Sequence, residues 1–247
     1  MTQPTAQFSN YILPRLQNVA PIDNLIYDEL GQAVLRTHNE QFQGTAIADT
    51  TKYQKNQPIA HSNIPRALSY NHILHKLTNG RIQVASPADV VQFWDDIPER
   101  GTTYADTNSI TLFSNTGDNQ DLAQRVFNIL GRTSTEVPLL VADLGIEKAD
   151  NKYGFTFAQT DRTKAIEAPY LTQDGKVRYD PKTRSLVAAK ADEKGVQVWT
   201  SSNQSDLRGA YRNWGLNLSC GGERLLGSSA GGRVQVVQAD PKGCAEK

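Results

Sequence analysis

The sequence contains few of the residues on which disulfide-rich and metal-binding proteins depend. It has two cysteines among 247 residues, both within the last 28, and four histidines. A disulfide scaffold needs more cysteines, and a zinc site needs paired Cys or His spacings that are absent. A Cys220–Cys244 bridge stays geometrically open, but the lack of a secretory signal favours reduced thiols.

An excess of one charge and long apolar runs are missing too. The chain balances 26 Lys+Arg against 26 Asp+Glu, whereas a nucleic-acid-binding protein needs a basic excess. No apolar stretch approaches the ~18 residues of a membrane span, and the first residues lack the basic and apolar regions of a signal peptide. These absences predict a cytoplasmic protein with neither a nucleic-acid nor a membrane partner. A phage virion is the alternative location.

Local patterns predict three helices. Apolar residues recur at helical spacing over 65–77, and an Asn-Gly pair ends that segment. An N-cap serine followed by proline predicts a second helix over 87–94. A third, amphipathic helix is expected over 119–130, with a glycine after it. Residues 1–60 show little periodicity, and we expect them to form an irregular arm or edge.

Short strands are expected around these helices. They are predicted by alternating or continuous apolar residues, at 81–84, 109–113, 137–142, 153–157, 177–179, 186–188, 196–199 and 233–237. The chain is therefore predicted to be α+β, with short, twisted antiparallel sheets. We place a mixed α/β N-terminal part at 1–104 and a compact domain at 105–247.

Few patterns in the sequence indicate catalysis. The turn at 113–118 before a helix has the form of a phosphate loop, but it has one glycine and two aspartates close by, so a helix cap is favoured. His72 and His75 have the spacing of a metal-binding pair, yet half-buried helix positions are the simpler interpretation. No Ser, Cys or His constellation suits nucleophilic catalysis. The sequence predicts no enzyme, no cofactor and no metal.

The most informative stretch is 203–232. It holds seven of the 18 glycines, and Gly, Ser and Asn make up 14 of its 30 residues. Fixed apolar and cationic residues interrupt it, so it is not a flexible linker. The alternation in 214–219 places Leu216 and Leu218 on one face, and Gly215, Asn217 and Ser219 on the other. One face is expected to reach the core and the other to face solvent.

Three segments here resemble the end of a C-type-lectin-fold domain. They are Val-Gln-Val-Trp-Thr-Ser-Ser at 196–202, Leu-Arg-Gly-Ala-Tyr-Arg-Asn at 207–213 and Gly-Arg-Val-Gln-Val-Val at 232–237. The likeness is to the formylglycine-generating-enzyme-like subclass, and within it to the variable proteins of diversity-generating retroelements. In those proteins, adenine mutagenesis near the C-terminus interleaves Asn, Ser, Gly, Asp, Tyr and Cys with fixed residues.

The resemblance implies a C-type-lectin-like domain over 105–247 that binds a protein or other macromolecular ligand through a hypervariable surface near 203–232. The implied variable positions are Ala210, Tyr211, Asn213, Gly215, Asn217, Ser219, Cys220, Gly221, Gly222, Gly227, Ser229, Ala230 and Gly231. The implied scaffold positions are Trp199, Arg208, Arg212, Trp214, Leu216, Leu218 and Arg233. Trp199 is expected to be buried, and the ligand's identity and the oligomeric state stay open.

Two other functions stay open beside this one. The first is an enzyme of the formylglycine-generating type, whose cysteine pair Cys220 and Cys244 do not match. The second is a virion structural protein with a glycine-rich loop. A near-identical repeat of the 3′ end of the gene beside a reverse transcriptase would distinguish the variable-protein hypothesis from both of these alternatives.

Overall fold

The computed structural model describes residues 21–22, 29–48, 62–96, 104–200, 206–214, 217–222, 225–228 and 232–238. The helices found there are α1 (Glu29–Phe42), α2 (Ile64–Thr78), α3 (Pro87–Gln92), α4 (Gln120–Ile129) and the short 3₁₀ turns η3 (Trp94–Asp96) and η4 (Pro169–Leu171). The strands are β1 (Pro21–Ile22), β2 (Ile82–Val84), β3 (Tyr104–Leu112), β4 (Leu139–Ala142), β5 (Gly145–Lys148), β6 (Phe155–Ala158), β7 (Lys164–Glu167), β8 (Gly175–Asp180), β9 (Ser185–Ala188), β10 (Val196–Trp199), β11 (Leu207–Arg212), β12 (Leu218–Gly222), β13 (Gly232–Val234) and β14 (Val236–Gln238).

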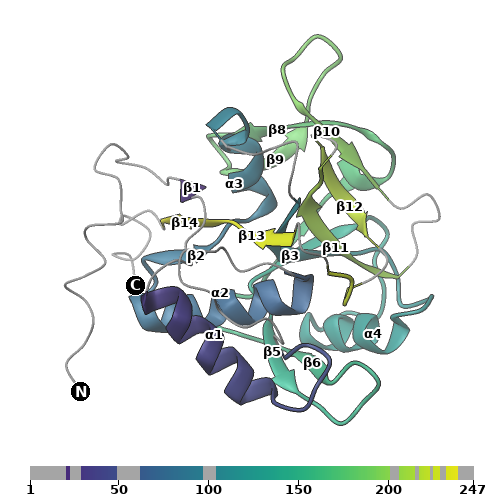
Figure 1. The fold of residues 1–247 in the computed structure, drawn as a ribbon. Helices are drawn as coiled ribbons and strands as arrows, with labels where there is room; N and C mark the ends of the chain where they lie inside the picture. The colour runs from purple at the N-terminus through teal and green to yellow at the C-terminus, as the bar shows by residue number, and fades with distance from the viewer. Residues whose placement is uncertain are drawn as a thin grey trace.

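The largest sheet is mainly antiparallel. In the described part of the chain its strands run in the order β7-β4-β3-β11-β12-β10-β8-β9, and β13 pairs with the start of β3. Two of its pairings, β10 with β12 and β13 with β3, are parallel. The sheet curls into a half-barrel (Figure 1). The predicted α+β class is confirmed, and the parallel pairings are a feature that the predicted antiparallel sheets did not include.

Both faces of this sheet are covered. On one face, α2, α4 and the β5–β6 hairpin share a core with β3 and β4. On the other face, α3 and η4 pack against β8, β10 and β12. Strand β4 belongs to both cores, because Leu139 and Val141 point to the first and Leu140 to the second. This two-sided burial explains why its sequence is continuously apolar.

Two helices begin where local chemistry predicts, and α2 also ends at its predicted signal, whereas α3 ends at Gln92, two residues earlier than expected. Asn63 caps α2 by accepting a hydrogen bond from the Arg66 amide, and Asn79 ends it in the left-handed conformation. Ser86 and Asp89 form a reciprocal capping box at the start of α3. Such caps satisfy amide groups that have no partner inside the helix.

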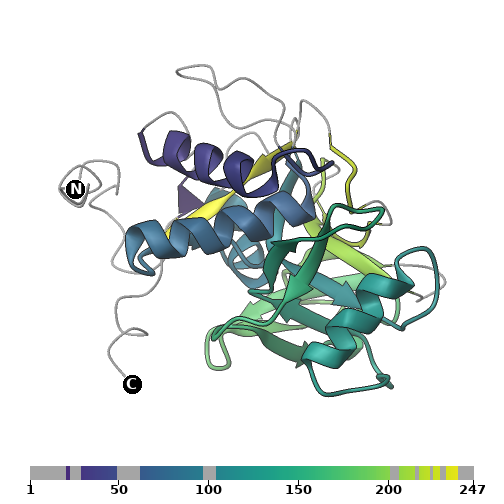
Figure 2. The ribbon, with the colours of Figure 1, turned by 90° about the horizontal axis from the view of Figure 1, so that it is seen from below.

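Helix α1 contradicts the irregular arm predicted for residues 1–60. It packs beside α2, as Figure 2 shows from below. Its buried side recurs every four residues at Leu30, Val34, His38 and Phe42. His38 is fully buried, donating from Nε2 to the Ile47 carbonyl at 2.8 Å and accepting the Ser69 hydroxyl at Nδ1 at 2.8 Å. This helix was not predicted from the sequence because a histidine interrupts its row of buried apolar residues.

Strand β3 contains a wide bulge at its centre. Gly209 of β11 pairs with Ile110, but Tyr211 pairs with Asp106, so residues 107–109 lie opposite Ala210 alone. The Thr107 hydroxyl donates to the Ala210 carbonyl at 2.5 Å. This side-chain contact, together with backbone hydrogen bonds that join Asn108 to Ala85 and Asp143, replaces missing ladder bonds.

A second sheet joins distant parts of the chain. Strand β14 lies between β1 and β2 and is antiparallel to both. Val234 and Val236 share a core with α1 and α2. The chain on either side of residue 104 therefore packs together.

Candidate functional site

Part of the 203–232 segment forms a ladder within the main sheet. Strands β11 and β12 are antiparallel, with Tyr211 opposite Ser219 and Arg212 opposite Leu218. On the far side of β12, Ser219 pairs with Trp199 of β10. Because residues directly opposite on neighbouring strands point to the same face, Tyr211, Ser219 and Trp199 form a row across three strands.

Two more aromatic residues extend this row. The Tyr104 ring, at the start of β3, meets Tyr211 edge-on with ring centroids 6.1 Å apart. The indole of Trp214 stacks on Tyr104 at 6.1 Å and 18°. We call Tyr104, Trp199, Tyr211 and Trp214, with Ser219 among them, the aromatic face. Trp199 and Trp214 are 50% and 48% exposed, so the face offers two indoles to solvent.

Hydrogen bonds fix the position of the Tyr104 ring. Its hydroxyl donates to the Ser62 carbonyl at 3.0 Å, just before α2. A Cβ atom at Gly232 would overlap the same hydroxyl, so a larger residue there would require the Tyr104 ring to move. Beyond the end of β11, the Asn213 side chain accepts a hydrogen bond from the Trp214 amide at 2.8 Å. The Tyr104–Trp214 stack is therefore held at both ends.

The structure corrects several predicted variable positions. Ala210 and Cys220 are buried in the core shared with α3, beside Leu218. They alternate with Tyr211 and Ser219 along their strands and so face the opposite side of the sheet. Their assignment to an exposed surface was wrong.

The other variable positions differ in exposure. Asn217 and Ser219 are each only 7% exposed, so the prediction that they face solvent is also wrong. Ser219 is flanked by aromatic residues on both neighbouring strands, and large neighbours shield a small side chain. Tyr211, Asn213 and Gly221 are half-buried, and Gly227 is exposed. The structure describes the backbone of Gly222 in β12, while Gly215, Ser229, Ala230 and Gly231 lie outside the described residues.

The predicted scaffold positions differ in burial. Leu218, Arg208 and Arg212 are buried, and Arg233 is half-buried. Trp199 was expected in the core, but its neighbours Val196 and Val198 occupy the core side of β10. Trp214, also placed in the scaffold, follows the end of β11 and is half exposed. Leu216 lies outside the described residues.

Of the two aromatic residues outside 203–232, Trp199 was predicted as a buried scaffold position and Tyr104 was not predicted at the site. Nothing local marks Tyr104, which reaches it through the pairing of β3 with β11. The alternation Val196-Gln197-Val198-Trp199 did contain a signal, because it places Trp199 opposite the two valines.

A fully buried carboxyl group lies under the aromatic face. Asp106 pairs with Tyr211 on β11 and with Val234 on β13. Burial raises the pKa of Asp106 to about 7, while the neighbouring Ser62 hydroxyl acts in the opposite direction. Within the described residues, neither Oδ2 of Asp106 nor Oγ of Ser62 has a hydrogen-bond partner.

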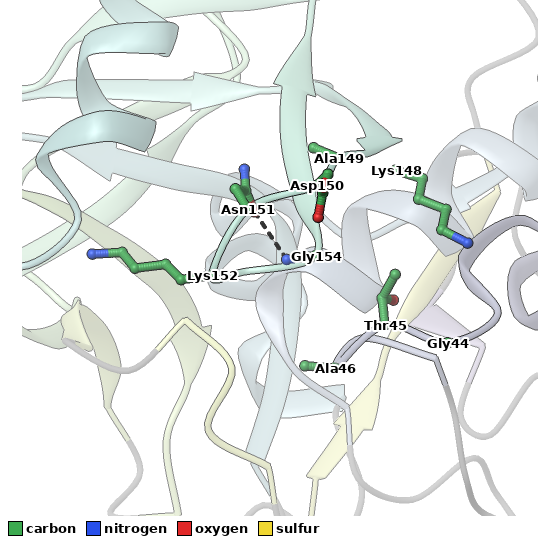
Figure 3. A pocket seen from close by; sticks show the side chains of 9 residues that line it. All are labelled: Gly44, Thr45, Ala46, Lys148, Ala149, Asp150, Asn151, Lys152 and Gly154. Carbon is green, nitrogen blue, oxygen red and sulfur yellow. Dashed lines mark hydrogen bonds between the residues drawn. The ribbon is translucent and has the colours of Figure 1, made fainter.

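An open depression of ≈ 420 Å³ lies elsewhere, between the turn after α1 and the loop joining β5 to β6 (Figure 3). Lys148 and Lys152 point away from one another there and donate to the Gln43 and Asp118 carbonyls. Asn151 closes the loop by accepting from the Gly154 amide at 2.9 Å. These contacts hold the loop, and they do not converge on a shared point.

Other candidate chemistry has a structural explanation. Among the described residues, His, Cys, Asp and Glu form no group of three that could hold a metal ion. Burial lowers the pKa of both His72 and His75. Burial also raises the pKa of Cys220 to about 12, so at neutral pH it is an unreactive thiol. Within the described chain, no helix has the length and apolar character needed to cross a membrane.

The helix cap predicted near 113–118 has an unexpected source. Asp206, from the 203–232 segment, is fully buried, and its Oδ2 accepts from the Asn119 amide at 2.8 Å, one residue before α4. A carboxylate therefore occupies the end of the helix where a phosphate would bind. The capping interpretation of this turn agrees with that contact.

Comparison of the chain with family models, with curated proteins and with solved structures finds no match.

Proposed function

We propose that this chain is a ligand-binding protein that recognises a protein or other macromolecule through the aromatic face. The observation that carries the proposal is the presence of two half-exposed indoles, Trp199 and Trp214, beside Tyr104 and Tyr211 on one side of the sheet. Trp and Tyr dominate binding energy at protein interfaces because they bury large areas and keep a polar group.

The arrangement behind this face supports a recognition role. Ala210, Leu218 and Cys220 alternate with the face residues and lie in the opposite core. Substitutions at Tyr211 or Asn213 therefore need not disturb that core, and changes at surface positions usually alter stability by under about 0.5 kcal/mol.

We further propose that the segment belongs to a variable protein of a diversity-generating retroelement, with a C-type-lectin-like fold. The supporting features are the composition of 203–232 and its resemblance to that family. Because Ala210 and Cys220 are buried in the core, we leave them out of the proposed variable set. Of the other described positions we keep Tyr211 and Ser219 on the aromatic face, together with Asn213, Gly221 and Gly227.

The gene itself tests the retroelement proposal. We expect a near-identical repeat of the 3′ coding region beside a reverse-transcriptase gene, with mismatches confined to adenines. The mismatches should fall in the codons of Tyr211 and Asn213 and spare those of Ala210 and Leu218. A gene with no such repeat contradicts the retroelement proposal, but it leaves ligand binding by the aromatic face open.

A display experiment tests recognition directly. A library of the full chain randomised at Tyr211 and Asn213 is selected on a panel of purified proteins. A matched library randomised at Lys182 and Thr183, on the exposed turn between β8 and β9, is the control. We expect binders from the first library only, and we expect Trp214→Ala to abolish their binding. Equal recovery from both libraries contradicts the proposal.

The alternative of a formylglycine-generating-type enzyme receives no support from the cysteine that the structure describes. Cys220 is buried beside Leu218 in the core, and burial keeps its thiol protonated at neutral pH. A catalytic or metal-binding cysteine needs access to its substrate and an available thiolate.

A further inference from the structure

The buried carboxyl of Asp106 is joined to the aromatic face through a short chain of contacts. Asp106 lies beside Ser62, at the N-terminal end of α2, and both are buried. The Tyr104 hydroxyl donates a hydrogen bond to the Ser62 carbonyl at 3.0 Å, and the indole of Trp214 stacks on the Tyr104 ring. These contacts connect the 62–63 segment to an exposed indole.

Among the described residues, arginines on the elements that flank Asp106 are directed away from it. Arg212 of β11 and Arg233 of β13 both pair with Ala105, the neighbour of Asp106, which places them on the opposite face of the sheet. The Arg66 guanidinium of α2 donates to the Ile47 and Ala48 carbonyls at 3.0 and 2.9 Å.

The described residues that flank Asp106 on the sheet are neutral. Tyr211 and Val234 flank Asp106 on the neighbouring strands, and Tyr104 precedes it by two residues on its own strand. Ser62, just before α2, completes the set. These residues supply no positive charge to balance an ionised carboxylate, which is costly to bury.

We propose that Asp106 makes the aromatic face respond to pH: the neutral acid supports the packed arrangement of Ser62, Tyr104 and Trp214, and ionisation loosens it. Burial among neutral neighbours disfavours the carboxylate, and the Ser62 hydroxyl beside it offsets that effect only in part. An ionised Asp106 needs water, which reaches it if the 62–63 segment moves away from β3. The consequence for ligand binding rests on the function proposed above, but the structural response does not.

The test uses the full chain without ligand. Trp94→Phe and Trp199→Phe leave Trp214 as the only tryptophan, and its fluorescence and acrylamide quenching are followed from pH 5 to 9. We expect quenching to rise with pH, with a midpoint near 7, while far-UV circular dichroism stays constant. Asp106→Asn should give a flat profile with the low-pH quenching.

A second variant keeps the proposal falsifiable if Asp106→Asn does not fold. Because the Ser62 hydroxyl lowers the pKa of Asp106, Ser62→Ala should move the midpoint upward. A flat profile in the parent, or a midpoint unaffected by either substitution, overturns the proposal. Both measurements concern the free protein, so failure to bind any ligand would count against the proposed function alone.

Discussion

Asp206 holds the 203–232 segment to α4, and its substitution tests that link. Asn119 provides no side-chain cap of its own. Instead its backbone amide and its Nδ2 both donate to Asp206 Oδ2, at 2.8 and 3.0 Å. Hydrogen bonds to a charged group are worth about 1.5–3 kcal/mol each, and the left-handed backbone of Asp206 (φ 75) costs alanine a further ~1 kcal/mol. We expect Asp206→Ala to lower the free energy of unfolding by about 4 kcal/mol.

Two controls separate this contact from a general loss of charge. Asp206→Asn keeps an acceptor oxygen and tolerates the left-handed backbone, so it should cost about 1–2 kcal/mol. Asp118→Ala removes an exposed carboxylate at the same end of α4 and should cost under about 0.5 kcal/mol. Urea unfolding at pH 7, followed by far-UV circular dichroism, measures all three. The reasoning is refuted if Asp206→Ala costs no more than Asp118→Ala.

Leu218→Ala should lower the free energy of unfolding by about 3–5 kcal/mol, measured with urea, because its side chain is fully buried. Ser219→Ala should lower it by under about 1 kcal/mol. Equal losses would contradict the assigned faces of β12. Gly209→Ala should destabilise the chain, because a Cβ there lies 2.6 Å from Cγ1 of Ile64. Adding Ile64→Ala should reduce that penalty in a double-mutant cycle, and an additive result would argue against the clash. In a Cys244→Ser background, Cys220 should react with a thiol reagent only as the protein unfolds; rapid labelling of the native protein would contradict its burial.

Elements governed by neighbouring residues were predicted well from the sequence. The Asn-Gly pair that ends α2, the Ser86 capping box and the alternation of β10 each depend on contacts a few residues apart. The bulge in β3 was not predictable, because it depends on the pairing of 106–110 with β11. The capping of α4 by Asp206 involves residues more than eighty positions apart in sequence.

The candidate site shows the same division. Alternation correctly assigned Leu218 to the core, but it did not reveal which elements cover each face. Cys220 and Ala210 were therefore assigned to the wrong face. Cys220 follows Leu218 by two residues on β12, and Ala210 lies on the same side of the neighbouring strand β11. Trp199 was expected in the core because it is large and apolar, whereas two valines on its own strand already occupy that side. Tyr104 belongs to the site only through the register of β3 with β11.

The central position of β14 in its sheet has a consequence for synthesis. Its partners β1 and β2 are translated long before it. At ~5–20 residues per second, β1 waits roughly 10–40 s for the strand with which it pairs. Once β2 has been made, it exposes an unpaired edge until β14 arrives. Over the same period α1 and α2 lack the apolar cover supplied by Val234 and Val236. A nascent chain interrupted before residue 236 therefore exposes this strand edge and these apolar helix faces to chaperones and proteases. Pairing of β14 with β1 and β2 covers them.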